Sequence, residues 1–138
     1  MEWRVIPLQA NNAFMNMAIE EAVSESVANN ASPTIRFFRW FPSAVSIGYF
    51  QSLRDEVNIE KCDELGLYVV RRRTGGGAVY HDYEGEITYS VIAPESTFPR
   101  GIKETYFMVC KWVINALRHI GIESEFVPIN DIVVFGKK

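Results

Sequence analysis

The residues of this chain best suited to chemistry lie together in residues 71–82, Arg-Arg-Arg-Thr-Gly-Gly-Gly-Ala-Val-Tyr-His-Asp. Three consecutive arginines supply permanent positive charge and paired N–H donors for an anion. Three consecutive glycines leave the backbone uncovered, so that successive N–H groups can bind phosphate or carboxylate oxygens. The stretch therefore predicts an anion-binding loop, although a glycine-rich β-hairpin with a basic edge would use the same residues.

Two common phosphate-binding patterns do not match this stretch. A P-loop would continue into Gly-Lys, and here the glycines are followed by Tyr80-His81. A dinucleotide fingerprint beginning at Gly75 would need Gly or Ala where Tyr80 stands, and the segment that follows has the pattern of a strand. A nucleotide bound by this loop is therefore expected in another kind of fold.

The wider stretch resembles the signature of lipoate–protein ligases and their lipoyl or octanoyl transferase relatives. The similar residues are Arg71-Arg72-x-Thr-Gly-Gly-Gly-Ala-Val-x-His-Asp, followed by Gly85-Glu86-x-Thr-Tyr-Ser. Residues 16–22 (Asn-Met-Ala-Ile-Glu-Glu-Ala) resemble the first helix of that family, and residues 130–138 resemble the segment that leads to its essential lysine. The resemblance therefore extends over almost the whole chain.

Composition limits the classes of protein that remain. The chain has 138 residues, 48% of them hydrophobic, and a net charge of −3, which predicts one soluble globular domain and argues against a nucleic-acid partner. No apolar run is long enough for a membrane span and the start is no signal peptide, so we expect no membrane partner and a cytoplasmic location. Cys62 and Cys110 have no metal-ligand spacing and are expected to be buried or half-buried free thiols.

The hydrophobic pattern indicates both helices and strands. The segments expected to be helical are about 13–28, 58–65 and 102–120. The segments expected to be strands are 3–8, 34–40, 44–50, 67–70, 86–92, 123–127 and 132–135. We expect 34–40 and 44–50 to form an antiparallel hairpin, and a second hairpin to turn at 82–85.

Strands without a regular βαβ alternation predict an α/β fold of the α+β type, with a mixed, largely antiparallel sheet flanked by helices. The resemblance narrows this to the fold shared by biotin and lipoate ligases and class II aminoacyl-tRNA synthetases. Gly48 within a strand suggests a close backbone approach. Glu20 and Glu21 are expected mostly at the surface, and the alternative is that one of them orients the site. The aromatic residues expected in the core are Phe37, Phe38, Trp40, Tyr49 and Phe50.

The resemblance implies an enzyme that activates lipoate with ATP and passes the lipoyl group to a lysine of a lipoyl-domain or H-protein-like acceptor. Such chemistry needs positioning and charge stabilisation more than a covalent nucleophile. ATP and Mg²⁺ would be consumed or bound transiently, lipoate would be the substrate, and no tightly held prosthetic group is expected. The residues that the resemblance assigns to ATP or the adenylate are Arg71, Gly75, Gly76, Gly77, Ala78, Val79 and Lys138.

The same resemblance assigns lipoate binding to Arg72, His81 and Lys138, with Lys138 as the catalytic lysine and Lys137 facing solvent. Strand alternation would allow only one of Arg71 and Arg72 to face the site, and Arg71 is favoured. His81 lies two residues after Val79 and is expected on the same pocket wall. Asp131 is expected to bind Mg²⁺ with pyrophosphate, and a simple turn aspartate is the alternative.

Two other functions remain open from the sequence. The first is an octanoyl or lipoyl transferase, which would act through a cysteine thioester, with its nucleophile expected after Lys138. The second is a non-catalytic subunit that binds lipoate or the acceptor. Gly76-Gly77-Ala78 favours the ligase, because octanoyl transferases often place an arginine after two glycines. Since the family's catalytic domain continues past this lysine, residues 1–138 are expected to be the N-terminal portion of one domain, truncated or completed by a second chain.

Overall fold

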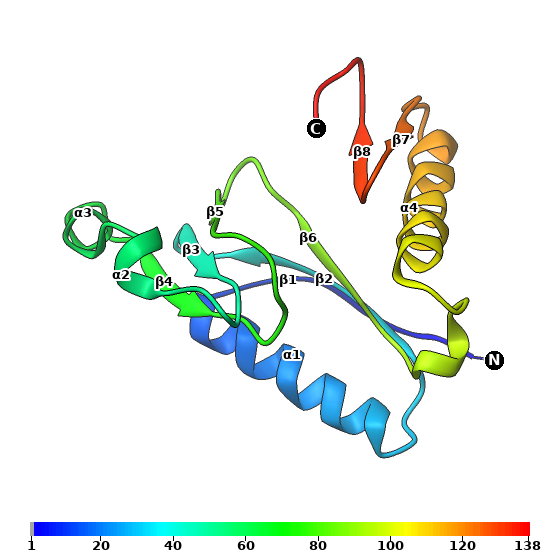
Figure 1. Cartoon of the computed structure of the whole chain (residues 1–138), viewed down its shortest axis with the longest axis horizontal. Coiled ribbons are helices and arrows are strands. Elements are labelled where there is room, and N and C mark those ends of the chain that lie inside the picture. The colour runs from blue at the N-terminus through cyan, green and yellow to red at the C-terminus, as the bar shows by residue number, and fades with distance from the viewer. Residues whose placement is uncertain (1) are drawn as a thin grey trace. The chain divides into compact units, whose positions relative to one another are not determined.

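The computed structural model describes residues 2–138, which divide into two compact units between Pro94 and Glu95. Figure 1 labels the helices and strands of both units. Mixed sheets flanked by helices confirm the expected α/β class. Each unit is built around its own strands.

The first unit contains two three-stranded sheets. One has the order β1 (Arg4–Asn11), β2 (Thr34–Trp40) and β6 (Thr88–Ile92), with β1 parallel and β6 antiparallel to β2. The other places β3 (Ala44–Ile47) between β4 (Tyr68–Arg71), which is parallel to it, and β5 (Val79–His81), which is antiparallel. The short helices α2 (Leu53–Glu56) and α3 (Ile59–Glu64) connect β3 to β4.

Both predicted hairpins are wrong. The segments 34–40 and 44–50 belong to different sheets, because β2 is already flanked on both edges by β1 and β6. Residues 82–85 carry the chain from β5 in one sheet to β6 in the other, and these two strands do not pair. Which strand lies beside another depends on pairing between distant segments, which local periodicity does not report.

Helix α1 (Ala13–Ala28) covers one face of the first sheet (Figure 1). It begins where predicted, since the side chain of Asn12 accepts a hydrogen bond of 2.9 Å from the backbone N–H of Met15. The face of β2 that packs towards α1 consists of alternate buried residues, namely Thr34, Arg36, Phe38 and Trp40. This packing builds the core of the first unit.

The aromatic residues expected in the core divide into two groups. Phe38 and Trp40 pack with Ala13 and Ala44 in a buried cluster. The prediction is wrong for Phe37, Tyr49 and Phe50, which are exposed. Phe37 lies on the opposite face of β2, and β3 ends at Ile47, so that the other two residues fall in the turn that follows it.

The second unit consists of the turn η1 (Glu95–Thr97), helix α4 (Ile102–His119) and the antiparallel strands β7 (Glu125–Val127) and β8 (Asp131–Val133). Gly121 follows α4 with a φ of +83°, the left-handed conformation predicted for a residue that ends a helix. Cys110 in α4 and Cys62 in α3 are buried free thiols, as expected. Among residues 2–138, no helix combines the length and apolar character needed to cross a membrane.

Gly48 follows β3 at a point where two backbone segments meet. A Cβ atom at this position would lie 2.1 Å from the carbonyl oxygen of Gly76. The backbone N–H of Tyr49 also donates a 2.9 Å hydrogen bond to the carbonyl of Thr74. The close approach expected at Gly48 is therefore present, and its partner is the glycine loop, which we define as residues 74–78.

We predict that Gly48→Ala lowers the free energy of unfolding by about 1–3 kcal/mol, because the added methyl group would displace the loop backbone. Gly75→Ala is the matched control, since a Cβ there meets no atom within 4 Å. Urea denaturation of both variants measures the difference. Equal unfolding midpoints for the two variants would contradict the close approach.

Candidate functional site

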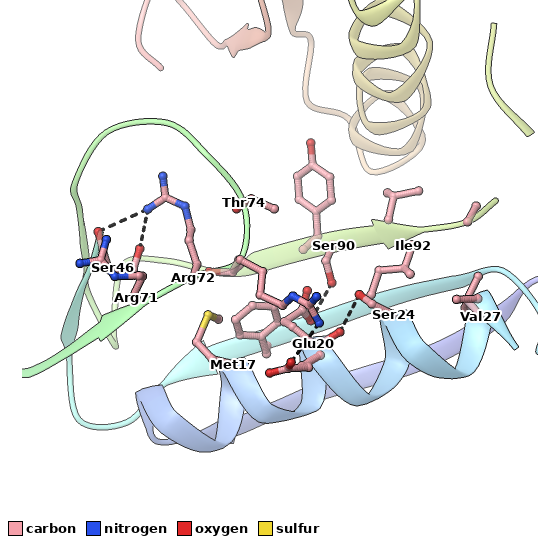
Figure 2. Close-up of a pocket in the computed structure, with 18 of the residues that line it drawn as sticks. Met17, Glu20, Ser24, Val27, Ser46, Arg71, Arg72, Thr74, Ser90 and Ile92 are labelled. Carbon is pink, nitrogen blue, oxygen red and sulfur yellow. Dashed lines mark hydrogen bonds and ion pairs between the residues drawn. The ribbon is translucent and has the colours of Figure 1, made fainter. Parts of the chain in front are cut away.

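A cavity of about 970 Å³ lies within the first unit. Its walls come from α1, from the buried face of β2, from β6 and the residues after it, and from the end of β4. Figure 2 shows Ser46 and Arg72 at one end, Glu20 and Ser90 midway, and Val27 and Ile92 at the other end. The cavity therefore runs from a polar end to an apolar end.

Arg72 joins the polar end of the cavity to the glycine loop. Its Nη1 donates a 3.1 Å hydrogen bond to Ser46 Oγ, and its Nη2 donates to the carbonyls of Gly75 and Gly77, each at 2.8 Å. Burial lowers the pKa of Arg72, but a guanidinium stays protonated at neutral pH. Arg72 thus holds the loop through a permanent charge.

Arg71 also lines the cavity, so the prediction that only one of the two arginines faces it is wrong. Strand β4 ends at Arg71, and the alternation of side chains does not extend to Arg72. Arg71 Nη1 lies 3.0, 2.9 and 2.6 Å from the carbonyl oxygens of Gly48, Tyr49 and Gln51. Its role in binding phosphate stays a prediction.

His81 lies in the cavity wall with hydrogen-bond partners on both ring nitrogens. Nε2 is 2.8 Å from Ser46 Oγ, and Nδ1 is 2.8 Å from Glu86 Oε1. The ring stacks on Trp40 with centroids 4.0 Å apart and an angle of 13° between the planes. Val79 lines the same cavity, as expected for two residues on one strand face.

Sequence reasoning missed Ser46 and Glu86, although signals were present. Glu86 lies inside the Gly-Glu-x-Thr-Tyr-Ser segment that carries the resemblance. Ser46 is a polar residue, 1% exposed, in an otherwise apolar strand, which indicates a hydrogen-bond partner for it inside the protein. Both side chains meet at His81.

Burial alone would raise the pKa of Glu86. Hydrogen bonds from His81 and Thr88, the charge interaction with His81 and a backbone hydrogen bond from Asp82 outweigh it, so the pKa of Glu86 lies below its ordinary value of 4.5. Glu86 is therefore a carboxylate at neutral pH and accepts hydrogen bonds only.

Glu20 is half-buried, and the expectation that it lies at the surface is wrong. Its Oε1 pairs with the fully buried Arg36 at 2.8 Å and accepts a 2.9 Å hydrogen bond from Ser90 Oγ. Figure 2 shows Glu20 on α1 next to Ser90 on β6. The neighbouring Glu21 is exposed, as expected, and forms an ion pair with Arg73 at 2.9 Å.

The other predicted site residues fall in two places. Gly75, Gly76, Gly77 and Ala78 form the glycine loop between β4 and β5. Asp131 and Lys138 belong to the second unit, where Lys138 Nζ lies 2.7 Å from Asp131 Oδ1. Lys137 is exposed, as expected.

The prediction that Asp131 binds Mg²⁺ is not supported by a cluster of ligands. Among residues 2–138, no group of three or more His, Cys, Asp or Glu side chains is placed to hold a metal ion. A cation bound to Asp131 together with a phosphate would have to replace the ammonium group of Lys138. The magnesium assignment remains a prediction.

We predict that Glu86→Gln lowers the free energy of unfolding by about 1 kcal/mol at neutral pH, the value of a hydrogen bond to a charged group that becomes neutral. Because the folded pKa of Glu86 is depressed, its stabilising contribution is present above pH 4.5 and is lost as the pH falls through the folded value.

Urea denaturation between about pH 7 and pH 3 should therefore show that the stability difference between Glu86→Gln and the unmodified protein shrinks in acid. Glu64→Gln, at an exposed carboxylate paired with Lys61, is the matched control. A difference that stays constant over the whole pH range would contradict the assignment.

One family model and several curated proteins are similar to this chain in sequence. The model of the lipoyl protein ligase A/B catalytic domain matches residues 12–138. Octanoyltransferase LipM of Macrococcus caseolyticus is 40% identical over 128 residues, which cover 91% of this chain and 46% of that protein. Octanoyltransferase LipM of Staphylococcus epidermidis is 40% identical over 127 residues, which cover 90% and 45% respectively. The chain thus spans about half the length of the curated relatives it matches.

Solved structures of lipoate ligases have the same fold as this chain. A lipoate-protein ligase A bound with ATP superposes with a TM-score of 0.81 and 32% identity, covering 97% of this chain and 57% of the other. A bi-partite lipoate protein ligase from Thermoplasma acidophilum gives a TM-score of 0.83 and 31% identity, covering 99% and 52%. The chain therefore belongs to the family of the lipoyl protein ligase A/B catalytic domain.

Proposed function

We propose that this chain forms part of an acyltransferase that moves an octanoyl group to a lysine of a lipoyl-domain acceptor through a cysteine thioester. The observation that carries the proposal is the 40% identity, over 91% of the chain, to a protein named octanoyltransferase. This reverses the order of the two enzymatic functions expected from the sequence.

The shape of the cavity supports an acyl substrate. Its apolar end, between Val27 and Ile92, can surround a hydrocarbon chain, and its polar end at Ser46, Arg72 and His81 can face the acyl carbonyl. About 970 Å³ lies at the upper end of the range of small-molecule pockets, so an eight-carbon chain would leave room for more of the substrate.

The hydrogen bonds of the two arginines also suit a site without a triphosphate. Arg71 Nη1 donates to three backbone carbonyls, and Arg72 is shared between Ser46 and the glycine loop. These bonds give both guanidinium groups a role in shaping the cavity wall. A thioester carbonyl needs to be oriented and to receive a few hydrogen bonds. Unlike a triphosphate, it carries no phosphate charges that the site must neutralise.

Neither described cysteine is suited to carry the acyl group. Cys62 is buried in a core cluster with Ile47 and Val57. Cys110 is buried in the second unit, where burial and the nearby charge of Asp131 raise the pKa of its thiol. A nucleophilic cysteine needs access and thiolate character, so we propose that the thioester forms on a cysteine outside the described residues.

An ATP-dependent lipoate ligase is the second candidate. A lipoate-protein ligase A bound with ATP and a related structure with bound lipoic acid share this fold at 32% and 33% identity. Gly76-Gly77-Ala78 also lacks the arginine expected in octanoyl transferases. The bi-partite ligase, described with its E2 lipoyl domain, makes a second chain and a lipoyl-domain acceptor reasonable partners in either case.

We predict that the full-length protein transfers an octanoyl group from octanoyl-carrier protein to an apo lipoyl domain without ATP. Intact-mass spectrometry of the acceptor measures the product, and an acceptor whose target lysine is replaced by arginine is the control. Modification that requires lipoic acid, ATP and Mg²⁺ would instead establish the ligase. Binding of the acceptor without modification in either mixture would favour a non-catalytic subunit.

We predict that Lys138→Ala lowers kcat/KM for acyl transfer by about a hundredfold or more, because the family resemblance assigns the catalytic positive charge to this lysine. Lys137→Ala is the matched control, since Lys137 is the exposed neighbour with the same charge. Steady-state kinetics of both variants measure the two changes in kcat/KM. Equal effects of the two substitutions would show that Lys138 has no special role.

A further inference from the structure

A continuous series of hydrogen bonds links Glu86 to the glycine loop. Glu86 Oε1 lies 2.8 Å from His81 Nδ1, and His81 Nε2 lies 2.8 Å from Ser46 Oγ. Ser46 Oγ accepts from Arg72 Nη1 at 3.1 Å, and Arg72 Nη2 donates to Gly75 and Gly77. We call this series the Glu86 relay.

Chemistry fixes the direction of the hydrogen bonds at the two ends of the relay. Glu86 is a carboxylate, so His81 Nδ1 carries the hydrogen that lies between them. When the imidazole is neutral, Nε2 accepts from the Ser46 hydroxyl, and when it is protonated, Nε2 donates to Ser46 Oγ. In either form Ser46 Oγ has a lone pair for Arg72, which can only donate. The series of hydrogen bonds is therefore complete in both forms of His81.

The far end of the relay is held in the core. Trp40 stacks on His81, and its Nε1 donates a 2.8 Å hydrogen bond to Thr88 Oγ1. Thr88 Oγ1 in turn donates to Glu86 Oε1. Trp40 is 2% exposed and His81 is 7% exposed, so water has little access to these two side chains. The relay therefore connects Arg72 to buried residues of the core.

The glycine loop needs such support because glycine has the largest backbone entropy to lose. A trans peptide places its C=O and N–H on opposite sides. When Arg72 holds the carbonyls of Gly75 and Gly77, it also sets the direction of the N–H groups of Gly76 and Ala78. Those N–H groups are the donors that a bare glycine loop offers to a carbonyl or anionic oxygen.

We propose that Glu86 and Ser46 are positioning residues, which act through His81 and Arg72 to preset the glycine loop for the acyl carbonyl. The use of this loop in acyl transfer rests on the proposed function, whereas the mechanical link from Glu86 to the loop does not. Glu86 is not among the residues that line the cavity, so its substitution tests the relay without removing a direct contact with the acyl chain.

A double-mutant cycle between Glu86→Ala and Arg72→Lys tests the relay in the full-length protein. Lysine keeps the charge at position 72 but has no fork of N–H groups to reach three acceptors. We expect each single variant to raise amide exchange at Tyr49, whose N–H donates to the loop carbonyl of Thr74, about tenfold, and we call this rate the loop exchange. Each should also lower kcat for octanoyl transfer about tenfold, with little change in KM. The double variant should be no worse than either single variant.

Two further variants sharpen the cycle. Glu86→Gln should restore part of the protection, because its amide oxygen still accepts from His81 Nδ1–H. Glu64→Gln is the control for loss of a carboxylate, and its loop exchange and kcat should equal those of the unmodified protein, since Glu64 pairs only with Lys61 on an exposed helix among the contacts described. If Glu86→Ala does not fold, either Glu86→Gln or Ser46→Ala takes its place in the double-mutant cycle with Arg72→Lys.

Amide exchange separates this proposal from the proposed function. Loop exchange that rises in the Glu86 variants and does not rise further in the double variant supports the relay, even if the protein transfers no octanoyl group. Effects of the two substitutions that multiply to about a hundredfold would show that they act independently and would overturn it. Loop exchange that is unchanged in a folded Glu86→Ala variant would overturn it as well.

Discussion

The hydrogen bonds of Arg72 are the interaction on which the site depends most. One guanidinium reaches Ser46 in the second sheet and two carbonyls of the glycine loop, and so joins strand β3 to the loop. Arginine suits this position because its planar fork carries several donors with a permanent charge. At Gly48 the loop meets β3 so closely that no side chain could lie between them. Together these contacts place the loop beside the cavity.

A buried charge supports Glu20, which lines the middle of the same cavity. Arg36 is fully buried and reaches both Glu20 and Asn16 of α1, with Nη2 2.6 Å from Asn16 Oδ1. An isolated buried charge is costly, and the pair with Glu20 offsets this cost only when the geometry is correct. The pair therefore specifies how α1 lies against β2, and it positions Glu20 to accept from Ser90 in β6. The polar centre of the cavity follows from the way that helix and sheet are joined.

The comparisons place one fold between two kinds of acyl chemistry. The curated relatives are named octanoyltransferases, whereas the solved structures are lipoate ligases, one of them bound with ATP. An octanoyl group and a lipoyl group are both hydrocarbon chains that end in a carbonyl, so either kind of enzyme needs an apolar place for the chain and a polar place for the carbonyl. A cavity with an apolar end and a polar end meets this shared need. What differs between them is the group that leaves the carbonyl, and function is decided by the residues that meet that group.

Local sequence determined the helices with their caps at Asn12 and Asn58, the buried free cysteines, and the glycine loop at the end of a strand, because each depends on neighbouring residues. The motif around the loop was specific enough to identify the family. Tertiary structure alone decided that β2 and β3 lie in different sheets, since strand partners are chosen over long distances. It also brought Ser46 to His81 through the pairing of β3 with β5, and it turned Glu86 back onto His81 in the connection after β5. No spacing in the sequence reports these two contacts.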